Sequence, residues 1–211
     1  HDTWGELSRL FTSTNYNIPH FVSPQGFLSR GDGTFQWNHT AFDDIRLFKL
    51  HKPWTATPHL FLFATPTSYV LTKTPFYYYE VMFFSQSTVG EPSISVGLIS
   101  GSYPLNHHVG WDQVSIGLHS DDGKIFHCSG RSSLVAMSPL KNLDVIGCGY
   151  DSDKGTVFYT VNGHLVYQNK TNVKNWTPSI GVKNVEMIKL NVGREPFVFD
   201  IGHVIDKNSI N

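Results

Sequence analysis

The residues best placed for chemistry are a histidine and a cysteine on either side of a predicted turn. Asp122-Gly123 favours a tight turn with positive φ at both central residues, joining strands over 115–119 and 124–128. Across that hairpin His119 and Cys128 share a face diagonally, an arrangement from which a nucleophilic Cys-His pair could be built. No third group is identified that would orient the histidine, and free cysteines are commonly small core residues. A half-buried pair that fills the sheet is therefore the competing interpretation.

Metal and cofactor chemistry is not supported by the remaining residues. The chain has eleven histidines, but His119 and His127 fall on opposite faces of the hairpin, and the neighbours His107 and His108 diverge in an extended chain. Two cysteines are too few for a structural zinc site or a disulfide scaffold. Phosphate-loop, dinucleotide, nucleophile-elbow and zinc-protease motifs are missing from the sequence. We therefore expect no catalytic residues, no metal and no cofactor.

Composition bounds the class of protein. The 211 residues are 40% apolar, which suits one domain with a large core, and 14% aromatic. Charged residues make up 16%, and the net charge is -1, so neither nucleic acid nor an anionic membrane is expected as the main partner. The longest apolar run, 60–64, is far shorter than the roughly 18 residues of a membrane-spanning helix. Proteins, glycans and small molecules remain as partners.

The elements that must position any site are short strands. Asn162-Gly163 predicts a two-residue hairpin turn, and Gly31-Asp32-Gly33 predicts an earlier hairpin. Residues 3–11 predict one short helix, because Thr3 and Glu6 can form a capping box before apolar residues at helical spacing. Turn residues recur about every ten positions after Phe27, a spacing typical of an all-β sandwich or barrel.

Two patterns inside the strands carry more specific predictions. The continuous aromatic run over 76–84 indicates a strand covered on both faces, with a stacking platform for sugars or bases as the alternative. Glycines within strands weaken them and suggest bulges or close approach of a neighbouring backbone. We expect this at Gly97, Gly117, Gly147 and Gly149.

The sequence gives opposing indications about the compartment. Few cysteines favour reduced thiols in the cytosol. Three glycosylation sequons, at Asn38, Asn169 and Asn175, would be used only if the chain entered the secretory pathway. Because the chain begins at His1 rather than Met, we expect a fragment whose targeting signals could have been removed.

Several ordered segments together resemble the SPRY domain, and more closely the type found in Ran-binding protein M and its relatives. The resemblance runs from residue 75 to residue 200, and residues 1–74 match only loosely. The matching segments are Phe76-Tyr77-Tyr78-Tyr79-Glu80-Val81, Ile94-Ser95-Val96-Gly97-Leu98, Gly110-Trp111-Asp112, 115–124, Asp144-Val145-Ile146-Gly147-Cys148-Gly149, 156–163 and 191–200.

The resemblance implies an all-β fold, a distorted two-sheet antiparallel β-sandwich of the concanavalin-like jelly-roll kind, with a short N-terminal helix. We expect one domain over 1–211, in which 75–200 is the core and 1–74 adds strands and the helix. The implied function is a non-catalytic module that binds a short peptide or protein segment through edge loops. Family members often select substrates for ubiquitin ligases or act as scaffolds, so ubiquitin-ligase subunits are candidate partners and a cytoplasmic or nuclear location is expected.

Two alternatives of other classes stay open beside this interaction module. The first is a lectin-like glycan-binding domain of an exported protein, suggested by the aromatic content and the sequons. The second is a thiol enzyme that uses Cys128 and His119.

The resemblance also places the site. In peptide-binding relatives the pocket uses the loop that ends in a Gly-aromatic pair and the loop before the last core strands. In this sequence the corresponding site residues are Tyr103, Leu105, Asn106, Gly110, Trp111, Val182, Lys183 and Asn184. Trp111 stands where relatives that bind an Asn-rich peptide have Tyr, and Lys183-Asn184 replaces their Trp-Gly. We therefore expect a different peptide.

Trp111 and Lys183 have roles that can be argued from their chemistry. A tryptophan on a loop offers large apolar area with little rotamer entropy to lose, so Trp111 could anchor an interface. The alternative is that it closes the end of the sandwich as a core residue. Lys183 could attract an acidic ligand group, although single exposed lysines are usually just solvated.

Overall fold

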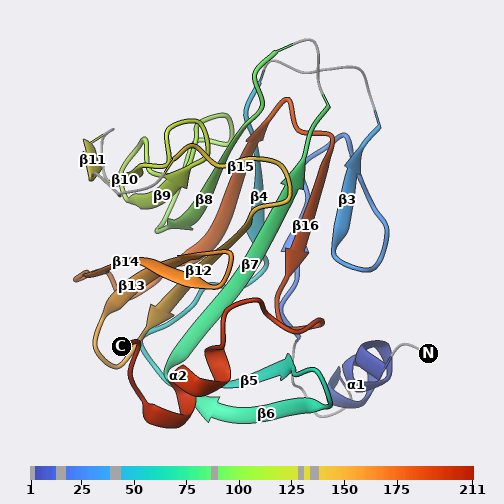
Figure 1. Ribbon diagram of the computed structural model, residues 1–211, viewed down its shortest axis with the longest axis vertical. Helices are drawn as coiled ribbons and strands as arrows, with labels where there is room; N and C mark the ends of the chain where they lie inside the picture. Colours follow the sequence, from blue (N-terminus) through green and yellow to red (C-terminus); the bar gives the residue numbers. More distant parts are fainter. Residues whose placement is uncertain (1–2, 13–17, 39–43, 87–89, 128–130, 134–137) are drawn as a thin grey trace.

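The computed structural model describes residues 3–12, 18–38, 44–86, 90–127, 131–133 and 138–211. Within them, two seven-stranded antiparallel sheets form a sandwich, with a separate two-stranded hairpin and two helices at one end (Figure 1). The predicted fold class, a distorted two-sheet antiparallel sandwich with a short N-terminal helix, is confirmed.

Both sheets draw strands from distant parts of the chain. The first sheet, called sheet A, has the order β1 (Phe21–Val22), β4 (Arg46–Leu50), β15 (Thr177–Lys183), β8 (Ser93–Ile99), β9 (Ser115–His119), β10 (Ile125–His127) and β11 (Arg131–Ser133). The second, sheet B, has the order β14 (His164–Lys170), β13 (Thr156–Val161), β12 (Val145–Asp151), β7 (Phe76–Phe84), β16 (Met187–Asn191), β3 (Thr34–Trp37) and β2 (Phe27–Ser29). The separate hairpin is β5 (His59–Ala64) with β6 (Tyr69–Thr74), and the helices are α1 (Thr3–Thr12) and α2 (Ile201–Lys207).

The aromatic strand β7 is buried on both faces, as predicted. Tyr79 and Val81 point into the main core between the sheets, because alternate residues of a strand face opposite sides. Phe76 and Tyr78 belong to a second cluster on the other face of sheet B, where Phe61 of β5 joins them. Residues of β5 and α2 cover that face, so the aromatic run serves packing.

Two tyrosine hydroxyls of sheet B cross the core to the backbone of sheet A. Tyr79 donates to the Gly97 carbonyl at 2.9 Å, and Tyr159 lies 3.0 Å and 3.2 Å from the carbonyls of Val96 and Ile116. A Cβ on Gly97 would lie 1.8 Å from the Ile116 carbonyl oxygen. The prediction that a glycine inside a strand marks close backbone approach is confirmed here.

Two of the three predicted hairpin turns are confirmed. Val161 pairs with His164 across Asn162-Gly163, whose φ values are 49° and 84°. Residues 30–34 close the turn between β2 and β3, where Gly31 and Gly33 also have positive φ.

The two-residue turn predicted at Asp122-Gly123 is wrong. The chain turns through four residues, 120–123, and Leu118 pairs with Ile125. The physical reason is that Ser120 is held by β8: its N–H donates to the Ile94 carbonyl, and its hydroxyl accepts from the Ile94 N–H, both at 2.9 Å. The register therefore moves by two residues, which leaves each side chain on its predicted face.

The C-terminal segment was not predicted as a helix, yet it covers sheet B. The Asp200 side chain accepts from the His203 N–H and caps α2. Just before the helix, the buried Glu80 carboxylate accepts from the N–H groups of Val198 and Phe199 at 2.9 Å and 3.0 Å. Burial raises the pKa of Glu80, and these hydrogen bonds oppose the rise.

Candidate functional site

The outer face of sheet A is built to carry a loop. Apolar residues of β8, β9 and β15 enter the core, while several alternate positions on the other face are serine or glycine. The small residues on that face are Ser95, Ser115, Gly117, Ser179 and Gly181. Residues 100–114 lie on this face, and Val109 among them is completely buried. A Cβ on Gly117 would lie 2.0 Å from the Val109 carbonyl oxygen, so only glycine allows this contact.

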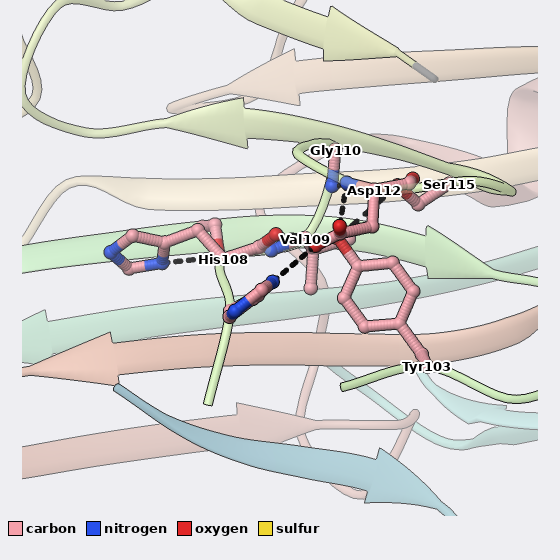
Figure 2. Close-up of polar contacts among 8 residues, drawn as sticks. Tyr103, His108, Val109, Gly110, Asp112 and Ser115 are labelled. Atoms are coloured by element: carbon pink, nitrogen blue, oxygen red, sulfur yellow. Dashed lines mark hydrogen bonds and ion pairs between the residues drawn. The ribbon is translucent and has the colours of Figure 1, made fainter. Parts of the chain in front are cut away.

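Tyr103 holds the loop in one conformation. Its hydroxyl donates to the His108 carbonyl at 2.6 Å and accepts from the Asp112 N–H at 3.0 Å. Ser115 of β9 donates to the Asp112 carbonyl and accepts from the Gly110 N–H. Figure 2 shows these hydrogen bonds: those of Tyr103 join the two ends of the loop to each other, and those of Ser115 join the loop to the sheet. Tyr103 is itself buried, so its role is to position the loop.

Two histidines hold the middle of the loop, of which His119 is buried and His108 is half-buried. His108 lies between two serine hydroxyls of β8, with Nε2 2.9 Å from Ser93 and Nδ1 2.8 Å from Ser95. His119 donates from Nε2 to the Val109 carbonyl at 2.8 Å. Burial, followed by the charges of His119 and Lys183, lowers the pKa of His108 to about 3, and burial also lowers the pKa of His119. Both rings are therefore neutral at pH 7.

The exposed residues of the loop form its outer surface. Trp111 is 53% exposed and Leu105 is 64% exposed, and Asn106 is exposed beside them in the chain. The Trp111 ring lies 6.0 Å from the ring of Phe126, which stacks on His119 at 4.2 Å. Trp111 therefore lies outside the core, against an aromatic support that sequence patterns did not indicate.

The three residues of the second predicted segment, 182–184, differ in how exposed they are. Val182 is completely buried in the core between the sheets. Lys183 ends β15 and is half-buried, opposite Ser93 of β8. Asn184 is buried, has a φ of 56°, and donates from its amide to the Glu91 carbonyl at 3.3 Å. Of these three residues, Lys183 is the one whose side chain a ligand can reach.

The structure joins the two predicted segments through His108. Ser93 contacts the His108 ring and pairs with Lys183, so the loop over 103–111 and the end of β15 meet at β8. We call the accessible residues Leu105, Asn106, Trp111 and Lys183 the loop surface. Tyr103, Gly110, Val182 and Asn184, which were predicted as peptide-binding, are buried beneath it.

Sequence reasoning missed the support below this surface, namely Phe126, His108 and His119. The available signal was the serine and glycine alternation in β8, β9 and β15, since a face of small residues needs something to cover it.

The described residues do not bring together groups suited to nucleophilic catalysis or to metal binding. Cys148 is completely buried, and burial raises the pKa of its thiol well above the usual range. Cys128 lies outside the described residues, so the predicted Cys-His pair is not tested. The described residues contain no group of three or more His, Cys, Asp or Glu placed to hold a metal ion. None of their helices is both long and apolar enough to cross a membrane.

The fold and the loop surface define the class: an antiparallel β-sandwich that carries an exposed surface on loops outside its core. The SPRY domain model matches residues 76–195, more than half of the chain, and the chain therefore belongs to the SPRY domain family. SPRY domains are generally protein-interaction modules and are typically non-catalytic. The resemblance inferred from the sequence is confirmed.

Curated relatives match the same region. The chain is 36% identical over 127 residues to Ran-binding protein 10 of Danio rerio and to Ran-binding protein 9 of Homo sapiens. Each match covers 59% of this chain, but 20% and 17% of the respective relatives. The chain thus spans about a fifth of the length of these proteins.

Solved structures show the same fold. A human SPRY domain structure superposes with a TM-score of 0.60 at 24% identity, covering 82% of this chain and 97% of that one. The TRIM65 PSpry domain gives a TM-score of 0.55 at 16% identity, covering 86% and 96%.

Proposed function

We propose that this chain is a non-catalytic protein-interaction module that binds a short peptide or protein segment through the loop surface. Residues 1–211 act as one domain in this proposal, with 75–200 as its core. The observation that carries it is Trp111, a tryptophan that is 53% exposed on a loop fixed to the sheet by buried hydrogen bonds of Val109 and Gly110.

A fixed loop is what an interface anchor requires. Ordering a mobile loop on binding costs conformational entropy, and the contacts of Tyr103, His108 and His119 have already ordered this one. Aromatic anchors on such surfaces commonly carry much of the binding energy. The neighbouring leucine, Leu105, extends the apolar area, and Lys183 adds one charge.

The absence of catalysis is part of the same proposal. His119 uses its Nε2 proton to hold Val109, and Cys148 is inaccessible and protonated. Neither is available to a substrate at the loop surface.

A peptide-display selection on the wild type and on Trp111→Ala tests this function. We expect the wild type to enrich a consensus motif and Trp111→Ala to lose it while keeping the wild-type melting temperature, because the side chain lies outside the core. Leu28→Ala is the matched control, since Leu28 is 55% exposed on sheet B, and it should enrich the same motif as the wild type. If the wild type enriches no motif, the result counts against peptide binding. Glycans or a large folded partner would then be the ligands to test.

The wider role rests on the resemblance to SPRY domains of the Ran-binding protein M type. We propose substrate recognition or scaffolding within a ubiquitin-ligase-type complex in the cytoplasm or nucleus. The three sequon asparagines, Asn38, Asn169 and Asn175, are all exposed and therefore accessible to glycosylation. A full-length protein purified from its own cells should show no mobility shift with a glycan-removing enzyme; a shift would support the exported, lectin-like alternative.

A further inference from the structure

A polar groove of about 560 Å³ lies at the end of the sandwich, next to the loop surface. We call it the end groove. Its lining includes Glu91, Ser93, Asp121, Lys141, Asn142 and Lys183. Lys183 belongs to both the end groove and the loop surface, so the two are continuous.

The walls of the end groove are fixed by hydrogen bonds. Asn142 bonds both backbone groups of Ser85, accepting from its N–H at 3.0 Å and donating to its carbonyl at 2.8 Å. Asn184 holds the Glu91 carbonyl, and Ser120 is bonded to the backbone of β8. A groove with ordered walls loses little entropy when a ligand enters it.

Four charged side chains line the end groove without pairing with one another. The ion pairs among the described residues are His107 with Asp112 and Lys189 with Glu195. Glu91, Asp121, Lys141 and Lys183 take part in neither. Two cations and two anions give the groove no net charge, which disfavours nucleic acid or an anionic lipid surface as its ligand. A ligand with both signs of charge suits it better.

Strand register sets the spacing of two of these charges. Lys183 pairs with Ser93 on β8, and Asp121 follows Ser120, which is bonded to Ile94 of the same strand from the β9 side. Lys183 and Asp121 therefore lie on either side of β8. The two strand spacings between them give a backbone separation of about 10 Å. An extended peptide advances about 3.3 Å per residue and alternates its side chains between two faces, so side chains two or four positions apart share a face and lie about 7 Å or about 13 Å apart, which brackets that distance.

We propose that the end groove binds a polar peptide segment whose acidic side chain pairs with Lys183 and whose basic side chain, two or four positions away, pairs with Asp121. The proposal rests on the proposed function, because it assigns the peptide chemistry of the same interaction surface. Ser93 and Asn142 also line the end groove, but the hydroxyl of Ser93 bonds His108 and the amide of Asn142 bonds Ser85, so the two charged side chains carry the recognition.

Selections with a random twelve-residue peptide library on charge-reversed variants test the proposal. We expect the wild type to enrich an acidic and a basic residue two or four positions apart, Lys183→Glu to lose the acidic preference alone, and Asp121→Lys to lose the basic preference alone. Lys154→Glu, an exposed lysine on the β12–β13 turn, is the control and should leave both preferences intact. Each reversal should weaken a wild-type consensus peptide by about two- to fivefold, as expected for partly exposed ion pairs.

A rescue experiment completes the test. Replacing the acidic residue of the consensus peptide by lysine should restore its binding to Lys183→Glu and weaken its binding to the wild type. A wild-type consensus that depends on Trp111 but is unchanged in both charge-reversed variants would overturn the end-groove proposal while leaving the proposed function standing. A wild type that enriches no peptide would overturn both.

Discussion

The stability of this domain should fall steeply in mild acid, because two neutral histidines are built into it. Burial lowers the pKa of His108 to about 3 and that of His59 to about 4, from 6.5 for an unperturbed histidine. His59 stacks on Tyr77 with ring centroids 3.6 Å apart and donates from Nε2 to the Phe76 carbonyl at 2.7 Å. At both sites burial disfavours the charged ring.

Proton linkage gives the direction and the size of this change in the free energy of unfolding. Below pH 6.5 the unfolded chain binds protons at both histidines and the folded chain does not, so the free energy of unfolding decreases as pH falls. Well below pH 6.5 each histidine contributes about 1.4 kcal/mol per pH unit, or about 2.7 kcal/mol per unit for the pair. From pH 6.5, where the unfolded rings are half protonated, to pH 5 the loss is about 3 kcal/mol, a large share of the roughly 5–15 kcal/mol that stabilises a typical domain.

Urea unfolding followed by tryptophan fluorescence at pH 7, 6 and 5 measures this loss. His108→Gln removes one titrating ring, so its slope of unfolding free energy against pH should be shallower, by a difference that grows to about 1.4 kcal/mol per unit near pH 5. His203→Gln, at an exposed position on α2, is the control and should keep the wild-type slope. Slopes are compared rather than absolute stabilities, because the raised pKa of Glu80 acts in the opposite direction. Equal slopes in the wild type and His108→Gln would refute the argument.

Two other perturbations have defined outcomes. Tyr159→Phe should lower the free energy of unfolding by about 1–3 kcal/mol, because it removes the buried hydroxyl that contacts the Val96 and Ile116 carbonyls; chemical denaturation measures it, and an unchanged value would show that these carbonyls need no donor. In a Cys128→Ser background, Cys148 should react with a thiol reagent only under denaturing conditions, since its thiol is completely buried with a raised pKa; fast labelling of the native protein would contradict that environment.

Local chemistry explains the elements that were predicted correctly. The Asn162-Gly163 turn depends on positive φ at two adjacent residues, which their side chains permit in any context. Likewise, the continuous aromatic run of β7 is compatible only with burial on both faces. The short helix α2 was missed although Asp200 signals its beginning, because seven residues give too few turns for a periodic pattern.

The candidate site was only partly predictable. The sequence and its family resemblance identified Trp111 and Lys183 as site residues, and both are accessible in the structure. It buries Tyr103 and Val182, which were proposed beside them. Accessibility depends on what packs over a residue, and no spacing along the chain contains that information.

The fold class, the Asn162-Gly163 hairpin and the SPRY family were predictable from the sequence, because strand alternation, turn chemistry and ordered motifs are properties of neighbouring residues. The register at residues 120–123 depends on a contact with a distant strand, because Ser120 binds to β8 instead of continuing the β9–β10 pairing. The tertiary structure also places Asp121 and Lys183 beside one groove, although they lie far apart in the chain. Contacts of that kind form only when distant strands assemble into a sheet, so they follow from the fold rather than from any local pattern.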